Sequence, residues 1–233
     1  MDELPYYNIS EKDKFMNFIY NHIDKNGTRL KFDNKFNGPF YPNCIPKTVT
    51  TVIFGKEFNQ PLITIDENNF VERLLPDSVT CLEFIDGSKY NQPLIINNIK
   101  VLPNSITKLV LSSRFNQPLI VSNIPVLPCF LEILSFGSYY RYYSLSDFNQ
   151  PLSVDDVRAI PDTLHSLYFS YLYTPILEGE LSNSLRNFNV GHTELQKEDI
   201  VLPYTIERVN ITNYFVYGKK YILSCPMIKS AII

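Results

Sequence analysis

One five-residue peptide, FNQPL, recurs along the chain and limits its fold more than any other feature. Identical copies begin at Phe58, Phe115 and Phe148, a variant YNQPL begins at Tyr90, and a weaker FNGPF begins at Phe36. So many copies in 233 residues indicate a repeat architecture. Proline lacks an N–H and favours an extended residue before it, so we expect each copy to form a tight turn. In that turn the Phe points into the repeat and the Asn amide bonds turn backbone.

A second pattern lies between the copies of FNQPL. After an anchor residue, usually proline, hydrophobic residues follow at the third, sixth and eighth positions, as in L-x-x-L-x-L. The last two are alternate residues, which in a strand point to the same face. The underlying period is about 22 residues, with insertions in the middle of the chain. The anchors are Asp24, Pro46, Pro76, Pro103, Pro128, Pro161, Ser182, Pro203 and Cys225.

This spacing predicts one short strand and one return path in each repeat. Equivalent strands then stack in parallel, because a single coil cannot bury its apolar face but neighbouring coils in register can. Each inward Val, Leu, Ile or Phe contributes about 1.5–3 kcal/mol when it is buried. We therefore expect a mainly β chain that forms a right-handed parallel β-solenoid of about eight or nine coils over residues 24–233.

The copies of FNQPL, together with LPDSVTCLEF and LPNSITKLVL, resemble the FNIP repeat. That family is similar to the leucine-rich repeats and is abundant in social amoebae and giant DNA viruses. The resemblance covers about residues 24–233 and implies a leucine-rich-repeat-like fold with a generic binding role, not a reaction. The coils anchored at Pro161, Ser182 and Pro203 depart from the pattern, since the first keeps only LYTPI and the others have no FNQP. For these coils we predict the strands more firmly than the return paths.

Residues 1–23 are expected to form an N-terminal cap, with a helix over about residues 10–23. Ser10 and Asp13 have the spacing of a capping box. An apolar stripe at helical spacing predicts a packing face, although a docking helix is the alternative. The stripe consists of Phe15, Phe18, Ile19, His22 and Ile23.

The two ends of the chain suggest alternative functions. Some proteins similar to FNIP-repeat proteins carry an F-box before the repeats, which would make this chain a substrate adaptor of a ubiquitin ligase. Only about 23 residues precede the first coil, about half of what an F-box needs. At the other end, the chain stops at Ile233 inside the last predicted strand. We expect that segment to pair as a final strand, the alternative being self-association of a structural protein through this edge.

Composition excludes several classes of protein. The net charge of −3 gives no electrostatic footprint for nucleic acid. No run of 18 apolar residues is present, so no membrane-spanning helix is expected. The acidic, polar start does not resemble a signal peptide, and the four Cys are scattered without a CxxC pair. These features predict a cytoplasmic protein, located in the host cytoplasm if the chain is viral.

The sequence offers no recognisable catalytic, cofactor or metal site. None of His22, His165 and His192 shares a repeat position with another, and no ligand spacing or glycine-rich phosphate loop occurs. Carbohydrate-active solenoids use paired carboxylates on a strand face. Among the outward strand positions Glu83 is the single carboxylate, and Cys81 is expected to be inert. We therefore predict a protein that is not an enzyme and needs no cofactor.

Two features predict a protein-binding surface. The centre of the outward strand face is apolar, with charges mainly towards the N-terminal coils. In addition, the coil after Pro128 carries eight extra residues within the segment GSYYRYYSLSD, residues 137–147. Tyr and Arg are enriched in binding hot spots, whereas the alternative is that these Tyr pack back over the coils. The candidate residues are Tyr139, Tyr140, Arg141, Tyr142 and Tyr143 in the loop, and Ile53, Val110, Ile133 and Tyr168 on the face.

We therefore expect non-catalytic binding of a host or self protein through the strand face and the Tyr-rich loop. A second insertion, over residues 65–75, is amphipathic and is expected to form a short convex helix.

Overall fold

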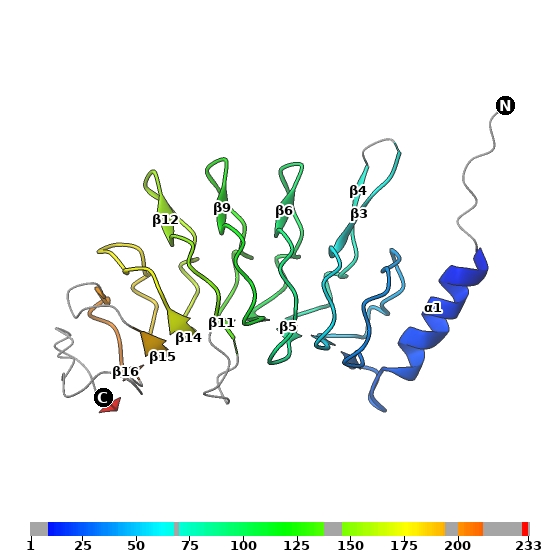
Figure 1. The fold of residues 1–233 in the computed structure, drawn as a ribbon, viewed down its shortest axis with the longest axis horizontal. Helices are drawn as coiled ribbons and strands as arrows, with labels where there is room; N and C mark the ends of the chain where they lie inside the picture. Colours follow the sequence, from blue (N-terminus) through cyan, green and yellow to red (C-terminus); the bar gives the residue numbers. More distant parts are fainter. Residues whose placement is uncertain (1–8, 68–69, 138–145, 194–199, 212–229, 233) are drawn as a thin grey trace.

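A computed structural model describes residues 9–67, 70–137, 146–193, 200–211 and 230–232. It is mainly β and forms a parallel solenoid with one helix at its N-terminal end (Figure 1). From β1 to β16 the chain completes about seven turns. One parallel sheet runs along the whole solenoid and consists, in order, of β1 (Arg29–Lys31), β2 (Thr51–Phe54), β5 (Cys81–Phe84), β8 (Lys108–Leu111), β11 (Ile133–Phe136), β14 (Ser166–Leu172), β15 (Asn187–Thr193), β16 (Arg208–Ile211) and β17 (Ser230–Ile232).

The strand register confirms the repeat pattern. Leu82 lies beside Leu109, and Leu134 lies beside both Leu109 and Leu167, so the central residues of the motif form one ladder. All four side chains are fully buried. The nine strands fall where the nine anchors predict them, because the two alternate apolar residues of each repeat must both face the interior.

The aromatic residue of FNQPL stacks from coil to coil inside the solenoid. Phe58, Tyr90 and Phe115 are fully buried, and the ring centroids of the two successive pairs are 6.1 Å and 6.4 Å apart. A second ladder of rings comes from the last residue of the strands, as in Phe54 and Phe84, whose centroids are 5.3 Å apart. The two ladders pack on each other, because the Phe54 and Phe58 centroids are 3.9 Å apart. The core is therefore two stacked columns of rings beside a column of aliphatic side chains.

The Asn and Gln of FNQPL connect successive turns. The Asn59 side-chain oxygen Oδ1 accepts a hydrogen bond of 2.9 Å from the backbone N–H of Asn91, and one of 3.1 Å from Gln92 Nε2. Asn91 Oδ1 accepts the same two bonds from Asn116 and Gln117, at 2.9 Å and 3.0 Å. The Asn amide bonds turn backbone, as expected. That backbone belongs to the equivalent turn of the next coil, so each tight turn is held by its neighbour.

After each of the four FNQPL and YNQPL turns the chain makes a small antiparallel hairpin. Positive φ angles at both central residues, as in Asn97 (51°) and Asn98 (60°), are those of a type I′ turn, which suits two-residue hairpins. These hairpins were not predicted from the sequence, and the helix expected over residues 65–75 is wrong, because this segment pairs with Ile63–Ile65 as a strand. The hairpins are β3 (Ile63–Ile65) with β4 (Val71–Arg73), β6 (Ile95–Ile96) with β7 (Ile99–Lys100), β9 (Ile120–Val121) with β10 (Ile124–Pro125), and β12 (Ser153–Val154) with β13 (Val157–Arg158).

The helix α1 (Ile9–Asn21) covers the first coil. Phe15 and Ile19 are buried, and the Phe15 ring meets the Phe40 ring edge-on at 5.1 Å. His22 Nδ1 lies 2.8 Å from the carbonyl oxygen of Phe18, so this histidine packs against the cap. The helix begins at Ile9, before Ser10, so Ser10 lies inside the helix and not at its N-cap as the capping-box spacing predicted. The helix therefore closes this end of the aromatic columns.

The sheet changes where the FNQPL pattern ends. β14 and β15 each have seven residues, against four in β8 and β11, and their pairing extends to Tyr171 beside His192. At the last coil β17 pairs with β16 in parallel, with Ala231 beside Val209, which confirms that this segment adds a final strand. The longer β14–β15 ladder supplies backbone contact in the coils that lack the Asn and Gln bonds.

Candidate interaction surface

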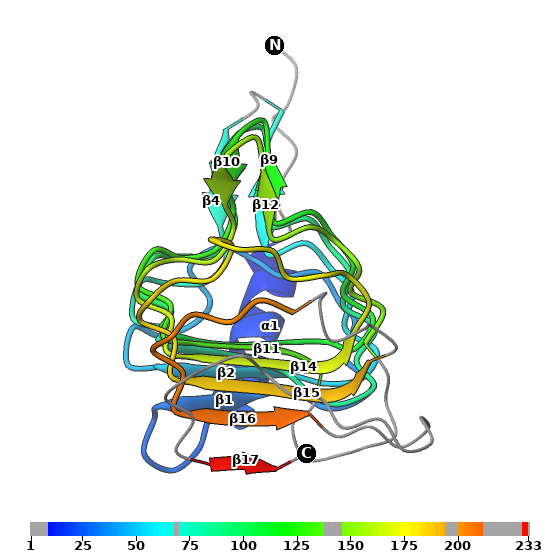
Figure 2. The ribbon, with the colours of Figure 1, turned by 90° about the vertical axis from the view of Figure 1, so that its left-hand side faces the viewer.

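The outward positions of the sheet form two rows that run along the solenoid. We call these two rows the sheet face. One row consists of Arg29, Thr51, Cys81, Lys108, Ile133, Ser166, Asn187 and Arg208. The other consists of Lys31, Ile53, Glu83, Val110, Ser135, Tyr168, Asn189 and Asn210. Figure 2 shows the sheet along one side of the solenoid and the hairpins on the opposite side.

The register brings three of the predicted residues together. Val110 on β8 and Tyr168 on β14 both lie beside Ser135 on β11, and Ile133 lies on β11 in the neighbouring row. All three predicted side chains are half-buried. Ser135 is buried and donates a hydrogen bond of 2.7 Å to the Gly137 carbonyl, which leaves the apolar side chains as the main surface here. We call Val110, Ile133 and Tyr168 the central patch.

Ile53 does not belong to the central patch. It lies on β2, separated from β8 by β5, and only 3% of it is exposed. Its outward position was predicted to present an apolar side chain to a partner, but the side chain offers almost no area. The reason lies in its row, where the long side chains of Lys31 and Glu83 stand beside it at strand spacing.

The Tyr-rich loop begins at the end of the central strand of the patch. β11 ends at Phe136, and Gly137 follows with φ 85° while its N–H donates a hydrogen bond of 3.1 Å to the Leu111 carbonyl. A Cβ at this glycine would lie 2.4 Å from Ser170 Oγ, so the close approach to β14 requires a residue without a side chain. Tyr139, Tyr140, Arg141, Tyr142 and Tyr143 lie outside the described residues.

Charge is distributed unevenly over the sheet face. Lys108 Nζ and Glu83 Oε1 form an ion pair at 2.5 Å near its middle. Arg29, Lys31 and Arg208 lie on the first and eighth strands and are exposed. Among the described residues none of these three forms a salt bridge, although the Asp24 carboxylate interacts with the charge of Arg29 and accepts a hydrogen bond from its N–H. The face is therefore basic at both ends and neutral around the central patch.

Cys81 lies on the same face but is poorly suited to nucleophilic chemistry. Burial, together with the nearby Glu83 carboxylate, raises the pKa of its thiol to about 11. The thiol donates a weak hydrogen bond of 3.6 Å to Glu83 Oε1. Since the thiolate is the reactive form, Cys81 stays protonated and unreactive near neutral pH.

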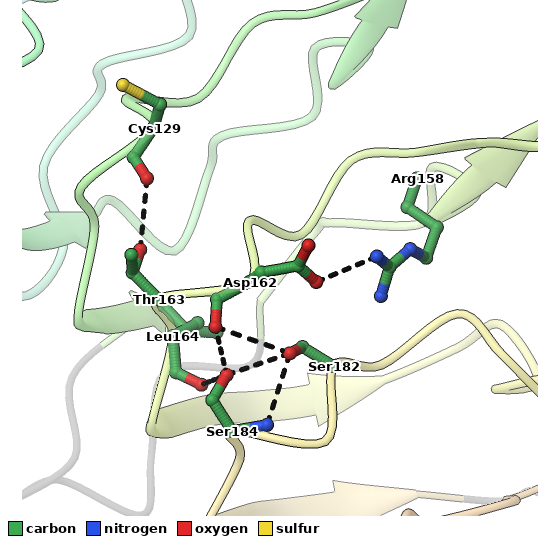
Figure 3. Close-up of polar contacts among 7 residues, drawn as sticks. All are labelled: Cys129, Arg158, Asp162, Thr163, Leu164, Ser182 and Ser184. Atoms are coloured by element: carbon green, nitrogen blue, oxygen red, sulfur yellow. Dashed lines mark hydrogen bonds and ion pairs between the residues drawn. The ribbon is translucent and has the colours of Figure 1, made fainter.

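Sequence reasoning missed the role of the hydroxyl residue that stands two positions after many anchors. Ser78 Oγ donates to the Val49 carbonyl, and Ser105 Oγ donates to the Val79 carbonyl, both at 2.8 Å. Thr163 Oγ1 bonds the carbonyls of Leu131 and Cys129, at 2.7 Å and 3.1 Å (Figure 3). The signal was present in the recurring P-x-[ST] tripeptide, whose hydroxyl satisfies a carbonyl of the preceding coil.

The coil whose anchor is Ser182 makes a variant of this contact. Figure 3 shows Ser182 in the place of the proline, with its Oγ accepting a hydrogen bond of 3.1 Å from the Ser184 N–H. Both hydroxyls donate to the Asp162 carbonyl, and Ser184 also donates to that of Leu164. The Asp162 carboxylate itself pairs with Arg158 at 2.7 Å. These contacts are structural and lie at the entry to the strands.

The described residues show neither a metal cluster nor a membrane span. No group of three or more His, Cys, Asp and Glu side chains among them is arranged to hold a metal ion. Within the same part of the chain, no helix has the length and apolar character needed to cross a membrane.

Comparisons with known proteins agree with the repeat pattern. The FNIP Repeat model matches residues 21–57, 36–66 and 98–139. A curated relative, the "Probable serine/threonine-protein kinase fnkA" of Dictyostelium discoideum, is 36% identical over 75 residues, which are 32% of this chain and 8% of the kinase. The crystal structure of CroV588, described as a novel circular LRR protein, is similar with 25% identity and a TM-score of 0.47 over 84% of this chain and 32% of CroV588.

The chain thus spans only a small part of the proteins that it matches, and the kinase match concerns a short stretch of repeats. The matched segments contain the FNGPF, FNQPL and L-x-x-L-x-L elements whose contacts build the coils. With its parallel strands in register, this chain contains FNIP repeats over the matched segments and forms a leucine-rich-repeat-like solenoid.

Proposed function

We propose that this chain is a non-catalytic binding protein that holds a host or self protein on its sheet face and on the loop of residues 137–147. The observation that carries the proposal is the central patch. Val110, Ile133 and Tyr168 come from three repeats of different length, yet the register places them on adjacent strands. An apolar centre bordered by polar and charged residues is the usual anatomy of a protein-binding surface.

The loop supports the same conclusion. Its four Tyr and one Arg are residue types that supply much of the energy in protein interfaces. It leaves the sheet from β11, the strand that carries Ile133. Residues in such a loop can vary without disturbing the coils, because the strand and FNQPL residues that stack and bond from coil to coil, such as Phe136 and Phe148, lie outside it.

The test is an affinity capture from a Dictyostelium discoideum lysate with purified protein as bait, read by mass spectrometry. The baits are the wild type, a deletion of residues 139–143, and Ile133→Asp. The matched control is Thr51→Asp, which places the same charge in the same row on β2, away from the patch. We expect specific proteins that the first two variants lose and the control retains.

Circular dichroism melts check that every variant is folded. Equal recovery of the same proteins by all four baits would refute the proposal. Ubiquitin-ligase subunits among the proteins retained would instead support the adaptor function.

A further inference from the structure

The four hairpins stand side by side on the side of the solenoid that is opposite to the sheet (Figures 1 and 2). We call the strand pairs β3–β4, β6–β7, β9–β10 and β12–β13, with the described residues of the turns between them, the hairpin crest. Three of its turns share one backbone conformation: Ser122 and Asn123 have φ angles of 50° and 60°, and Asp155 and Asp156 have 47° and 64°, close to those of Asn97 and Asn98. These hairpins therefore repeat one shape from coil to coil.

Apolar side chains line the crest along its length, and the exposed ones include Ile65 and Phe70 in the first hairpin and Val154 in the last. In the second and third hairpins the residues that flank the turn are Ile96, Ile99, Val121 and Ile124. Of these, Ile99 is 39% exposed, and the other three are half-buried with one side against the core. A hairpin with two-residue strands cannot cover them further, so part of each side chain faces solvent. The strip is therefore suited to contact with another apolar surface.

The outer hairpins of the crest carry acidic tips. The turn of the last hairpin is Asp155–Asp156, and Glu67 lies in the turn region of the first. The turn geometry does not require these charges, because Asn97–Asn98 and Ser122–Asn123 adopt the same backbone conformation with neutral side chains. Two adjacent carboxylates in one tight turn also repel each other. Along the solenoid the crest is thus apolar throughout and acidic at its two outer hairpins.

The sheet face has the complementary order. It runs from Arg29 and Lys31, through the central patch, to Arg208. Lys108 adds no net charge in the middle, because Glu83 pairs with it. This basic–apolar–basic order occurs in a chain whose net charge is −3. The charged ends and the apolar centre of the face therefore match those of the crest.

We propose that the hairpin crest of one copy docks on the sheet face of a second copy. This inference rests on the proposed function, since it uses the sheet face as a protein-binding surface, and it names the partner as the chain itself. The two surfaces lie on opposite sides of the molecule, so each copy offers one of each. Such a head-to-tail contact does not close in a dimer and propagates into longer oligomers.

The experiment is sedimentation velocity of the purified full chain over a range of concentrations, at low and at high salt. The crest variant is Asp155→Lys with Asp156→Lys, and the face variant is Arg29→Glu with Lys31→Glu. We expect the wild type to form a concentration-dependent series of oligomers that salt weakens, and each variant alone to remain a monomer. An equimolar mixture of the two variants should associate, because the intact crest of one variant then meets the intact face of the other.

Asp155→Asn with Asp156→Asn is the matched control, since Asn keeps the turn preference and removes only the charge. The association of this variant should be weaker than that of the wild type but stronger than that of the Lys variant. Thermal melts of all variants establish that loss of association is not loss of fold.

A wild type that stays monomeric at every concentration overturns the inference, and so does a mixture that contains only monomers. The proposed function has a separate readout. If the wild type is monomeric while Ile133→Asp loses captured proteins from the lysate, the sheet face binds another protein, and only the choice of a second copy as its partner is wrong.

Discussion

The Tyr90 ring stacks on the Phe84 ring with centroids 3.9 Å apart, and its hydroxyl is buried without a hydrogen-bond partner among the described residues. Tyr90 is the residue that replaces Phe in one copy of the repeated peptide. The hydroxyl thus sits inside a column of rings whose other members have no polar atom. A buried polar atom without a partner lowers stability.

Tyr90→Phe should therefore stabilise the protein. We expect the free energy of unfolding to rise by about 1 kcal/mol, because the desolvated hydroxyl is removed and the ring is kept. Urea denaturation of wild type and variant measures the difference. A variant that is less stable than the wild type would show that the buried hydroxyl is hydrogen-bonded in solution.

Tyr90 also predicts a dependence of stability on pH. Burial raises the pKa of its hydroxyl far above the ordinary value near 10. Above pH 10 the unfolded chain loses this proton while the folded protein keeps it, so the free energy of unfolding falls as pH rises. The difference between wild type and Tyr90→Phe should widen between pH 9 and pH 11 in urea titrations. A constant difference over this range would show that burial does not raise the pKa of the Tyr90 hydroxyl.

A substitution at Asn91 tests the hydrogen bonds by which the Asn side chains of FNQPL connect successive coils. Asn91→Ala removes the oxygen that accepts hydrogen bonds from the Asn116 N–H and from Gln117 Nε2, so we expect a loss of about 1–3 kcal/mol. Asn149→Ala is the matched control, because Asn149 Oδ1 accepts its hydrogen bond from its own neighbour Gln150 and not from the next coil. Urea denaturation should show a clearly smaller loss for the control. Equal losses would mean that the amides act within their own turns.

Leu109 tests the strand register. Leu109→Asp places an unpaired charge in a fully buried site and should cost more than about 4 kcal/mol, enough to unfold the array. Lys108→Gln, one residue earlier, points outward and removes a partly exposed ion pair, which costs at most about 1 kcal/mol. Circular dichroism melts of both variants check this. A folded Leu109→Asp protein would place the register one residue away.

The cysteines should differ in reactivity. Cys129 is exposed, whereas Cys81 is half-buried and the pKa of its thiol is raised to about 11. Brief treatment with a maleimide at pH 7 should modify Cys129 and leave Cys81 unmodified, and modification of Cys81 should increase as pH approaches 11. Peptide mapping by mass spectrometry measures both. Rapid labelling of Cys81 at pH 7 would contradict this account.

The strands could be predicted from sequence because burial acts on every repeat in the same way. Leu82, Leu109 and Leu134 occupy one column, and no other placement buries all of them. The hairpins could not be predicted as easily, since each strand has two or three residues and gives no alternation to detect. Their signal was the turn pair, as in Asn97–Asn98 between isoleucines. Over residues 65–75 the apolar residues fit the spacing of a helix as well as that of a strand, so the sequence did not distinguish the two.

The exposure of side chains on the sheet face was predicted less well than the burial of side chains in the core. Direction follows from alternation, so Val110 and Ile133 were correctly placed on the outward side. Exposure depends on the residues in the neighbouring coils, and those lie 22 to 30 residues away in sequence, as between Thr28, Thr50 and Thr80. For this reason Ile53, which points outward between Lys31 and Glu83, is nevertheless buried.

The two columns of rings have unequal spacing, and this makes each coil a wedge. Phe54 and Phe84, on the sheet side, are 5.3 Å apart, whereas Phe58 and Tyr90, in the same two coils but on the return path, are 6.1 Å apart. Every added coil of this kind rotates the growing end by a similar angle towards the sheet side. Duplication or loss of one repeat in evolution would therefore alter the arc by a fixed step, and the number of repeats alone would determine how far the sheet side of the protein curves.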